Sequence, residues 1–336
     1  MLAFRHLGQS HQLAAGGFYS QAPERLYADT PAATLRGIVA EIEAGAPWTE
    51  VIDRHYRASN PWLHGIICDP SRNTFFREIL PPRGLQVLDV GSGWGQQALE
   101  LARHNTVCAV EPNPDRLAFI RAAARQEQPR HALYYLAANF QDLEFESTFD
   151  LATCIGVLEW VGSFSPLPDP REAQRQFLRR LHGALKPGGR LVIGIENRLG
   201  LKYLMHAPDD HTGVADISCL PYEQANRLWR QRTGSDLRVI TYAEPEYRRL
   251  LAETGFTHAE FYAAYPDYKL ARVVLPCQPQ DRLNRYFLDG HHEPEHDGHT
   301  GSPLAFQDEL AAQYRTFAEL GLAAAVAPSY FIVATK

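Results

Sequence analysis

Short apolar segments alternate with helical segments through the middle of the chain, and this alternation restricts the possible folds more than any other feature. The apolar segments are six to nine residues long, which is typical of buried strands. Parallel strands need a crossover connection, usually a helix. The sequence therefore predicts an α/β fold with a doubly wound, Rossmann-like parallel sheet. The first five predicted strands are residues 85–90, 106–111, 131–138, 149–157 and 190–196.

Capping residues mark where the helices begin. Asn113-Pro114 and Asp169-Pro170 each place a side-chain acceptor before a proline at the first helical position. The second of these helices should stop at the KPGG sequence of residues 186–189. Further along, Thr241 to Glu244 forms a capping-box pattern that predicts another helix.

Two more strands are expected after that helix. Residues 257–265 predict a sixth strand, and the last nine residues, PSYFIVATK, predict a seventh that returns to the same sheet. We therefore expect one seven-stranded core with additions, rather than two separate domains. The expected parts are a helical N-terminal cap (1–80), a core (81–275) with an insertion (197–240), and an excursion plus the final strand (276–336).

Composition excludes some classes of protein. The chain has 33 Lys and Arg against 39 Asp and Glu, a net charge of −6, and 45% of its residues are hydrophobic. This balance excludes a largely disordered chain and disfavours a nucleic-acid partner. No apolar run approaches the roughly 18 residues that a membrane span needs. The start of the chain lacks a signal-peptide pattern, so the expected compartment is the cytoplasm, with no membrane association. The sequence gives no indication of oligomeric state.

A glycine-rich segment follows the first predicted strand. Asp89 ends the strand, and glycines follow at positions 91, 93 and 95. Glycine allows tight turns and close approach of a ligand to the backbone, and the next helix offers its N-terminus at the same place. Glu111 ends the next strand, where an acid can accept hydrogen bonds from both hydroxyls of a ribose. A nucleoside-containing cofactor is therefore predicted.

The glycine spacing distinguishes between cofactors. A dinucleotide fingerprint would place its third glycine at position 96, which is Gln96. The DxGxGxG pattern (residues 89–95) instead resembles motif I of class I S-adenosylmethionine-dependent methyltransferases. The resemblance covers roughly residues 80–275 and includes Glu111, VLEWV (157–161) and LKPGGRLVIGIE (185–196). It implies S-adenosylmethionine as cofactor.

The resemblance also implies which residues hold the cofactor. Asp89 and the glycine backbone would hold the methionine part, and Glu111 the ribose. Pro112 would lie beside the adenine and Ile155 beside the sulfonium, although a loop residue and a core residue are the alternatives for these two. Asn139 stands where the family usually has an Asp. The full implied set is Asp89, Gly91, Ser92, Gly93, Trp94, Gly95, Glu111, Pro112, Asn139, Phe140 and Ile155.

A narrower resemblance concerns residues 155–164 and 169–213. These segments are similar to a subgroup of bacterial methyltransferases found with surface-polysaccharide and glycosyltransferase systems. This implies a small-molecule acceptor, a glycan or another polar metabolite, methylated on a hydroxyl or an amine. The alternatives are a protein arginine or other macromolecule methyltransferase, of which only Glu159 is a matching feature, and a non-catalytic cofactor-binding protein.

Methyl transfer is an in-line displacement, so a base is needed only if the acceptor must lose a proton. The candidate catalytic residues are His211, Glu159 and Glu196. Asp209 or Asp210 could orient His211, and the alternative is that residues 208–213 form a simple turn. Glu196 and Asn197 could instead anchor the insertion.

No metal site is predicted. The histidines at 291, 292, 296 and 299 lie among acidic residues, but they lack the spacing of a zinc site, and a solvated mobile loop is expected there. Asp209 and Asp210 would be the first candidates for a divalent ion.

The N-terminal cap, the insertion and the excursion are expected to form the acceptor pocket. Its expected aromatic lining is Tyr262, Tyr265, Tyr268 and Trp229, for which core packing is the alternative.

Overall fold

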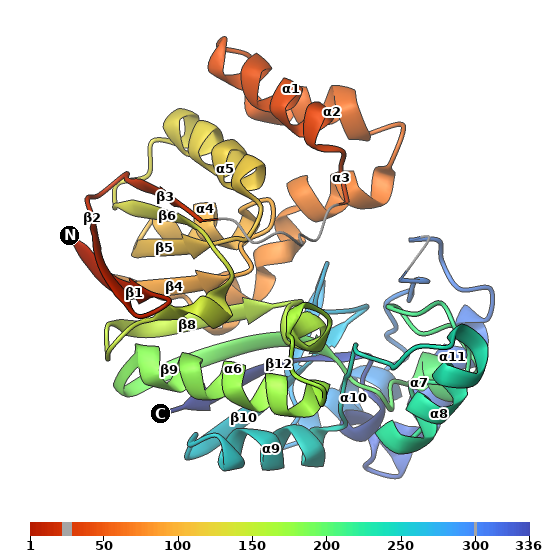
Figure 1. Cartoon of the computed structure of the whole chain (residues 1–336). Helices are drawn as coiled ribbons and strands as arrows, with labels where there is room; N and C mark the ends of the chain where they lie inside the picture. The colour runs from red at the N-terminus through yellow and green to blue at the C-terminus, as the bar shows by residue number, and fades with distance from the viewer. Residues whose placement is uncertain (22–28, 299–300) are drawn as a thin grey trace. The chain divides into compact units, whose positions relative to one another are not determined.

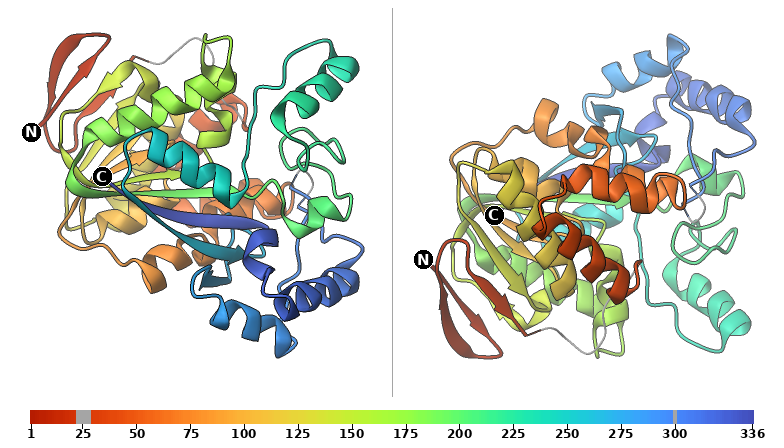
Figure 2. Two further views of the ribbon diagram at one scale, coloured as in Figure 1. Left: turned by 90° about the horizontal axis from the view of Figure 1, so that it is seen from below. Right: turned by 90° about the horizontal axis from the view of Figure 1, so that it is seen from above.

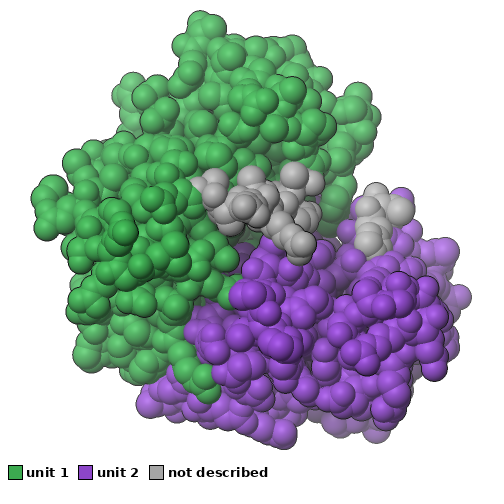
Figure 3. Space-filling model, in the orientation of Figure 1, with its two compact units in different colours: residues 1–155, 179–192, 335–336 green, residues 156–178, 193–334 purple. Residues whose placement is uncertain are grey.

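The structure, a computed structural model, describes residues 1–21, 29–298 and 301–336. The chain divides into two compact units (Figures 1 and 3). Unit 1 comprises residues 1–155, 179–192 and 335–336, and unit 2 comprises residues 156–178 and 193–334. Helix α6 (Pro170–Ala184) and strand β9 (Leu185–Glu196) each contribute residues to both units.

A parallel sheet forms the centre of unit 1. Strand β4 (Gln86–Val90) pairs in parallel with β5 (Thr106–Val110) and β8 (Phe149–Ile155), and β5 pairs in parallel with β6 (Leu133–Ala137). The strand order in this unit is β9-β8-β4-β5-β6-β3. Every residue of β4 after Gln86 is buried, as expected for a parallel strand covered on both faces. The predicted α/β fold is confirmed.

Helices of unit 1 form where the sequence predicted them. Helix α5 (Pro114–Glu127) begins after Asn113, whose side chain accepts a hydrogen bond from the Asp115 amide at 3.0 Å. Helix α1 (Ala32–Glu43) packs against α5, as the ribbon views show (Figures 1 and 2). The other helical elements of unit 1 are α2 (Trp48–Tyr56), α3 (Pro61–Cys68), η1 (Pro70–Asn73), η2 (Phe75–Ile79), α4 (Gln96–Ala102) and η3 (Phe140–Asp142).

The first twenty residues differ from the helical cap that the sequence predicted. They form strands β1 (Leu2–His6), β2 (Gln9–Leu13) and β3 (Phe18–Ser20). The β1–β2 hairpin adds the short strand β7 (Leu143–Glu144), and β3 pairs in parallel with β6. Buried and exposed residues alternate along β1, a period of two that the sequence already carried. The helical prediction is correct only from α1 to α3.

Unit 2 contains the remaining strands. Strand β10 (His258–Tyr265) pairs antiparallel with β11 (Val273–Pro276), and the order in this unit is β11-β10-β12-β9. Strand β12 (Ser329–Thr335) is the predicted seventh strand, and it lies between β10 and β9. All seven expected strands are present, and β3 and β11 add to them.

Two boundaries differ from the sequence prediction. Strand β9 already begins at Leu185, so the KPGG sequence lies within the strand. Helix α9 (Glu244–Glu253) begins later than the capping box at Thr241 implied, and the Ala243 amide donates to Glu246 Oε2 at 2.8 Å.

Among the described residues, no helix has both the length and the apolar character of a membrane span. The other helical elements of unit 2 are η4 (Leu158–Phe164), α7 (Leu201–Leu204), α8 (Tyr222–Thr233), α10 (Asp281–Leu288), α11 (Gln307–Glu319) and η5 (Ala323–Val326).

Candidate functional site

The glycine-rich segment of unit 1 forms a tight loop between β4 and α4. The amides of Gly91 and Ser92 both donate to the carbonyl oxygen of Val110, at 2.8 and 3.1 Å. Gly91, Gly93 and Gly95 have φ angles of +72°, +54° and +84°, which side chains rarely adopt. A Cβ atom on Gly95 would lie 2.7 Å from Ile120 Cγ1, whereas one on Gly93 would meet only the Gly91 carbonyl oxygen, at 3.9 Å. Gly95 therefore serves packing, and Gly93 leaves room for a ligand.

Asp89 is buried at the end of β4. Its Oδ1 accepts a hydrogen bond from the Thr153 hydroxyl at 2.6 Å, and its Oδ2 has no hydrogen-bond partner among the described residues. Burial raises the pKa of Asp89, and the bonds from Thr153 and Ser92 oppose the rise. A buried carboxylate oxygen without a partner is costly. Such an atom therefore suits a ligand group that can donate to it.

Glu111 lies directly after β5, beside the glycine loop. Its Oε2 accepts from the Gly93 amide at 3.0 Å, and its Oε1 accepts from the Asn113 amide at 3.1 Å. Burial raises the pKa of Glu111, and the nearby charge of Arg116 opposes the rise. Each carboxylate oxygen can accept more than one hydrogen bond, so the two amides do not exhaust its capacity. This arrangement fits a ribose diol.

The other predicted cofactor residues fall into different environments. Trp94 is buried, its Nε1 donates to Asp29 Oδ2 at 3.2 Å, and its ring packs edge-on against Phe119. The Asn139 side-chain oxygen accepts from the Gln141 amide at 3.1 Å, which uses one of its two lone pairs. Ser92 donates to the Asp89 carbonyl oxygen at 3.0 Å. Phe140 and Ile155 are buried and Pro112 is half-buried. Trp94 is thus a packing residue as well as a member of the loop.

Unit 2 contains a second group of polar residues at the ends of its strands. We define the ionic cluster as Glu159, Glu196, His211, Asp210, Lys202 and Lys269. Glu159 lies on η4, Glu196 ends β9, and Lys269 follows β10. His211 and Asp210 come from the 197–240 insertion. The three candidate catalytic residues are brought together: His211 Nε2 lies 3.9 Å from Glu159 Oε1 and 3.5 Å from Glu196 Oε2.

The ionic cluster is almost completely buried. The side chains of Glu159, Glu196 and His211 are 1%, 2% and 5% exposed. Asp210 accepts from Lys202 at 2.8 Å and from Lys269 at 3.3 Å, and Lys269 also contacts Glu196. With His211 protonated, the cluster balances three carboxylates against three cations. Removing such charges from water is expensive unless they are paired, and here they are.

The pKa values in the ionic cluster move in opposite directions. Burial raises the pKa of Glu159, although the contact with His211 opposes the rise. Burial alone would raise the pKa of Glu196, but the charges of Lys269 and His211 hold it well below its usual range. Burial alone would lower the pKa of His211, but Glu196 and Glu159 outweigh it and raise the pKa well above 6.5. These contacts therefore favour the imidazolium form of His211.

The two neighbouring aspartates have structural partners. Asp209 Oδ1 accepts from the amides of His211 and Thr212, at 3.0 and 2.8 Å, and its Oδ2 accepts from the Ser218 hydroxyl at 2.6 Å. The turn at 208–213, which the sequence offered as the alternative with a solvated histidine, is therefore present, but His211 within it is buried. Asp210 is occupied by two ammonium groups, which leaves it poorly suited to a divalent ion.

Glu159, Glu196 and His211 themselves offer ligand atoms within 4.8 Å of one another. The contact of Lys269 with Glu196 competes with a cation at this place. Asn197 has the anchoring role that the sequence left open, because its amide group donates to the carbonyl oxygens of Ala325 and Ala327 at 2.9 and 2.8 Å.

The histidine-rich segment is not a fully solvated loop. Glu295 is buried, its Oε1 accepts from the Tyr314 hydroxyl at 2.5 Å, and burial raises its pKa to about 7. His299 lies outside the described residues. The expected solvated loop is therefore wrong at Glu295, because helix α11 covers that carboxyl through Tyr314.

The insertion contains a small cavity. Its volume is about 60 Å³, and Arg198, Asp209, Tyr222, Tyr242 and Glu246 are among its lining residues. Of the expected aromatic lining, Tyr265 and Tyr268 are buried, and Tyr265 packs edge-on against other rings. Tyr262 donates to Glu260 at 2.8 Å, and Trp229 packs on the apolar cluster around Ile217. These four aromatics do not line this cavity.

Sequence reasoning missed Lys202 and Lys269. Lys269 follows the sixth predicted strand, and its position at a carboxyl end was the available indication. Lys202 gave no indication, because a lysine on a short helix is usually solvated.

Comparisons with known proteins find similarity over the segment that contains the glycine loop. Residues 88–193 match the model of a methyltransferase domain. Over 204 residues the chain is 26% identical to the tRNA U34 carboxymethyltransferase of Pseudoalteromonas atlantica, which covers 55% of this chain and 58% of that protein. It is 29% identical over 159 residues to the ubiquinone biosynthesis O-methyltransferase of Xanthomonas axonopodis, covering 44% of this chain and 61% of that one. The matches thus span less than two thirds of either relative.

Solved structures of methyltransferases are also similar. A SAM-dependent methyltransferase of Thermotoga maritima has a TM-score of 0.44 and 12% identity, covering 86% of this chain and 99% of that chain. Phosphoethanolamine N-methyltransferase 2 of Haemonchus contortus has a TM-score of 0.42 and 16% identity, covering 89% of this chain and 57% of that chain. These values are too low to transfer an acceptor.

The loop geometry and the matched family model concern the same segment. The β4 end, the glycine loop, Glu111 and β8 all lie within residues 88–193. Asp89, Gly93 and Glu111, to which the family resemblance gave cofactor contacts, lie in this segment. Residues 88–193 therefore match a methyltransferase domain, whose cofactor is S-adenosylmethionine.

Proposed function

We propose that this protein transfers a methyl group to a hydroxyl or amine of a small polar molecule. When bound, S-adenosylmethionine supplies a methyl group on a positively charged sulfur. Asp89, Gly93 and Glu111 would hold it, through the unpartnered Asp89 Oδ2, the open face of the loop and the Glu111 carboxylate. The residues of unit 2 would then bind the acceptor and take up its proton.

The observation that carries the acceptor chemistry is the state of Glu159. Its Oε2 is buried without a hydrogen-bond partner among the described residues, and its Oε1 lies 3.5 Å from the Tyr268 hydroxyl. Burial raises its pKa, which makes the carboxylate a stronger base than an exposed glutamate. Glu159 is thus suited to accept the proton that a hydroxyl or ammonium acceptor must lose.

His211 has a different role in this proposal from the base that we expected. An imidazolium has no lone pair to offer, so it cannot take a proton. Its position within 4 Å of both Glu159 and Glu196 lets its charge hold the two carboxylates together. We therefore assign His211 and Glu196 to positioning Glu159.

The chain itself limits how far Glu159 lies from the cofactor residues. Glu159 follows Ile155, the last residue of β8, by four positions. Four residues span at most about 14 Å even when fully extended. The chain therefore keeps the Glu159 backbone within about 14 Å of the Ile155 backbone.

The acceptor is proposed to be a glycan or another polar metabolite. Support comes from the sequence similarity of residues 155–164 and 169–213 to methyltransferases associated with surface polysaccharides. The net charge of −6 weighs against a polyanionic acceptor, although one relative is a tRNA-modifying enzyme. The relatives include ubiquinone biosynthesis O-methyltransferases, which supports hydroxyl groups as acceptors to be tested.

Two measurements test the proposal. Calorimetry should show one S-adenosylmethionine site, and release of S-adenosylhomocysteine should occur with a member of a panel of sugars, nucleotide sugars, phenols, amines and tRNA. Glu111→Ala should weaken cofactor binding at least about tenfold, since charged hydrogen bonds contribute about 1.5–3 kcal/mol. Glu50→Ala, an exposed change on α2, is the control and should bind normally. Equal binding by both variants would refute the cofactor assignment.

Glu159→Gln tests the base. It should bind the cofactor normally and lose about 10²- to 10⁴-fold in turnover, the usual contribution of general base catalysis. Turnover close to that of the wild-type protein, with an acceptor that carries an ionisable hydroxyl or ammonium, would exclude Glu159 as the base.

A further inference from the structure

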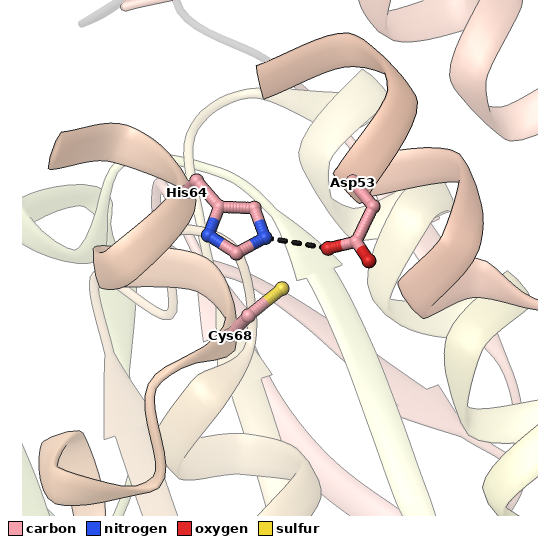
Figure 4. Close-up of side chains that lie close together, drawn as sticks. All are labelled: Asp53, His64 and Cys68. Carbon is pink, nitrogen blue, oxygen red and sulfur yellow. Dashed lines mark hydrogen bonds and ion pairs between the residues drawn. The ribbon is translucent and has the colours of Figure 1, made fainter. Parts of the chain in front are cut away.

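A second group of possible metal ligands lies in unit 1, on two helices that precede the glycine loop in the sequence. Asp53 comes from α2, and His64 and Cys68 come from α3 (Figure 4). Each offers one ligand atom, and these atoms lie within 4.8 Å of one another. The His64 Nε2 to Asp53 Oδ1 distance is 2.6 Å. We infer that these three side chains form a binding site for a divalent transition-metal ion of the zinc type.

The local structure holds these ligands in place before any ion arrives. His64 and Cys68 are four residues apart on α3, so they lie on the same face one turn apart. Helix α2 ends at Tyr56, and α3 begins at Pro61 after Asn60, whose side chain accepts from the Leu63 amide at 3.1 Å. A capped hairpin of two packed helices therefore fixes Asp53 opposite the α3 pair.

The ligand types select the class of metal. One carboxylate oxygen, one imidazole nitrogen and one thiolate sulfur suit Zn²⁺ or a metal of similar softness, such as Co²⁺, better than Mg²⁺ or Ca²⁺. Three protein ligands leave a fourth position for water. The His64 and Asp53 side chains are 19% and 36% exposed, so an ion can enter from solvent.

Protons must be displaced for the ion to bind. Burial raises the pKa of the Cys68 thiol to about 11, and the Asp53 charge adds to the rise, so the thiol is protonated in the metal-free protein. On binding, the S–H bond is replaced by a metal–sulfur bond and the proton passes to solvent. His64 binds through Nε2, so the hydrogen bond between Nε2 and Asp53 Oδ1 is lost and the ring keeps its one proton on Nδ1. Asp53 Oδ2 keeps its contact with Arg57 at 2.6 Å.

A neighbouring group of residues on α1 and α2 provides a matched control. His55 Nε2 lies 2.9 Å from Glu41 Oε1, and Arg54 lies 2.6 Å from Glu41 Oε2. This group repeats the His–carboxylate–Arg arrangement of His64, Asp53 and Arg57. It belongs to no group of possible metal ligands found among the described residues. Loss of His55 should therefore leave metal binding unchanged.

Cobalt and zinc titrations of the chelator-treated, full-length protein test the inference. One Co²⁺ per chain should give a thiolate-to-metal charge-transfer band in the near ultraviolet, and Zn²⁺ should remove the band by displacement. Zn²⁺ should also raise the melting temperature, because it binds the folded state. The ionic cluster contains no thiol, so an ion bound there would not give this band.

Substitutions of the proposed ligands test whether the ion binds at these residues. Cys68→Ser should lose the band, and His64→Ala should weaken binding at least about tenfold. His55→Ala should behave like the wild-type protein, and so should Cys219→Ser, a change at a half-buried free cysteine of unit 2. Melting curves without metal check that each variant is folded. Absence of the band in the wild-type protein, its persistence in Cys68→Ser, or an equal loss in His55→Ala would overturn the inference.

Discussion

The glycine loop of unit 1 and the ionic cluster of unit 2 are built in opposite ways. The loop is shaped for a ligand mainly by its backbone geometry. Its main residues, Asp89 to Glu111, lie within one β–loop–α–β segment. The ionic cluster works through side-chain charges, and Glu159 and Lys269 are 110 residues apart. A local site can be recognised from spacing, whereas a site assembled by charges depends on the whole fold of its unit.

The largest expected effect is the loss of protein stability when a lysine of the ionic cluster loses its charge. Lys269→Met would leave Glu196 and Asp210 buried with fewer cations, and losing one partner of a buried pair costs about 3–5 kcal/mol. Denaturant unfolding should show this loss. Lys186→Met in unit 1 removes an exposed contact with Asp150 and should cost at most about 1 kcal/mol.

A double variant makes that comparison sharper. Adding Glu196→Gln to Lys269→Met removes the unpaired charge and should recover part of the lost stability. No recovery would mean that packing of the lysine stem, and not its charge, stabilises the ionic cluster.

Glu295 offers a pH test of a buried charge in unit 2. Its pKa is about 7 in the folded protein and 4.5 for the ordinary group, so its protonated form favours folding below pH 4.5. This stability should be lost as pH rises through about 7, and the shift corresponds to roughly 3 kcal/mol. Glu295→Gln cannot ionise, so its free energy of unfolding should fall less between pH 5 and pH 8. Parallel pH profiles for the two proteins would contradict the raised pKa.

The smallest expected effects concern the loop glycines. Gly95→Ala should destabilise unit 1 by about 1–3 kcal/mol, because φ is +84° and the new methyl group would meet Ile120. Gly93→Ala should cost about 1 kcal/mol, because it adds strain without a clash. It should nevertheless weaken S-adenosylmethionine binding more than Gly95→Ala does. The opposite ranking in calorimetry would mean that the open face of Gly93 does not receive the cofactor.

The sequence by itself determined seven of the strands, the glycine loop and the starts of α5 and α6, because these depend on neighbours within a few residues. Apolar runs locate β4 and β5, and Asn113-Pro114 locates the start of α5. Gly91, Gly93 and Gly95 lie in the motif whose family resemblance implied S-adenosylmethionine. Strand β1 carried a period-two pattern that we overlooked, and β3 is too short to carry one.

Only the tertiary structure decided the chemistry of His211 and the place of Lys269. A histidine's protonation depends on the charges within a few ångströms, and those of Glu159 and Glu196 come from other elements of the fold. The pairing of Lys202 and Lys269 with Asp210 likewise depends on which strand ends and insertions meet. Local patterns are set by short-range backbone preferences, but the energy of a buried charge is set by every charge packed around it.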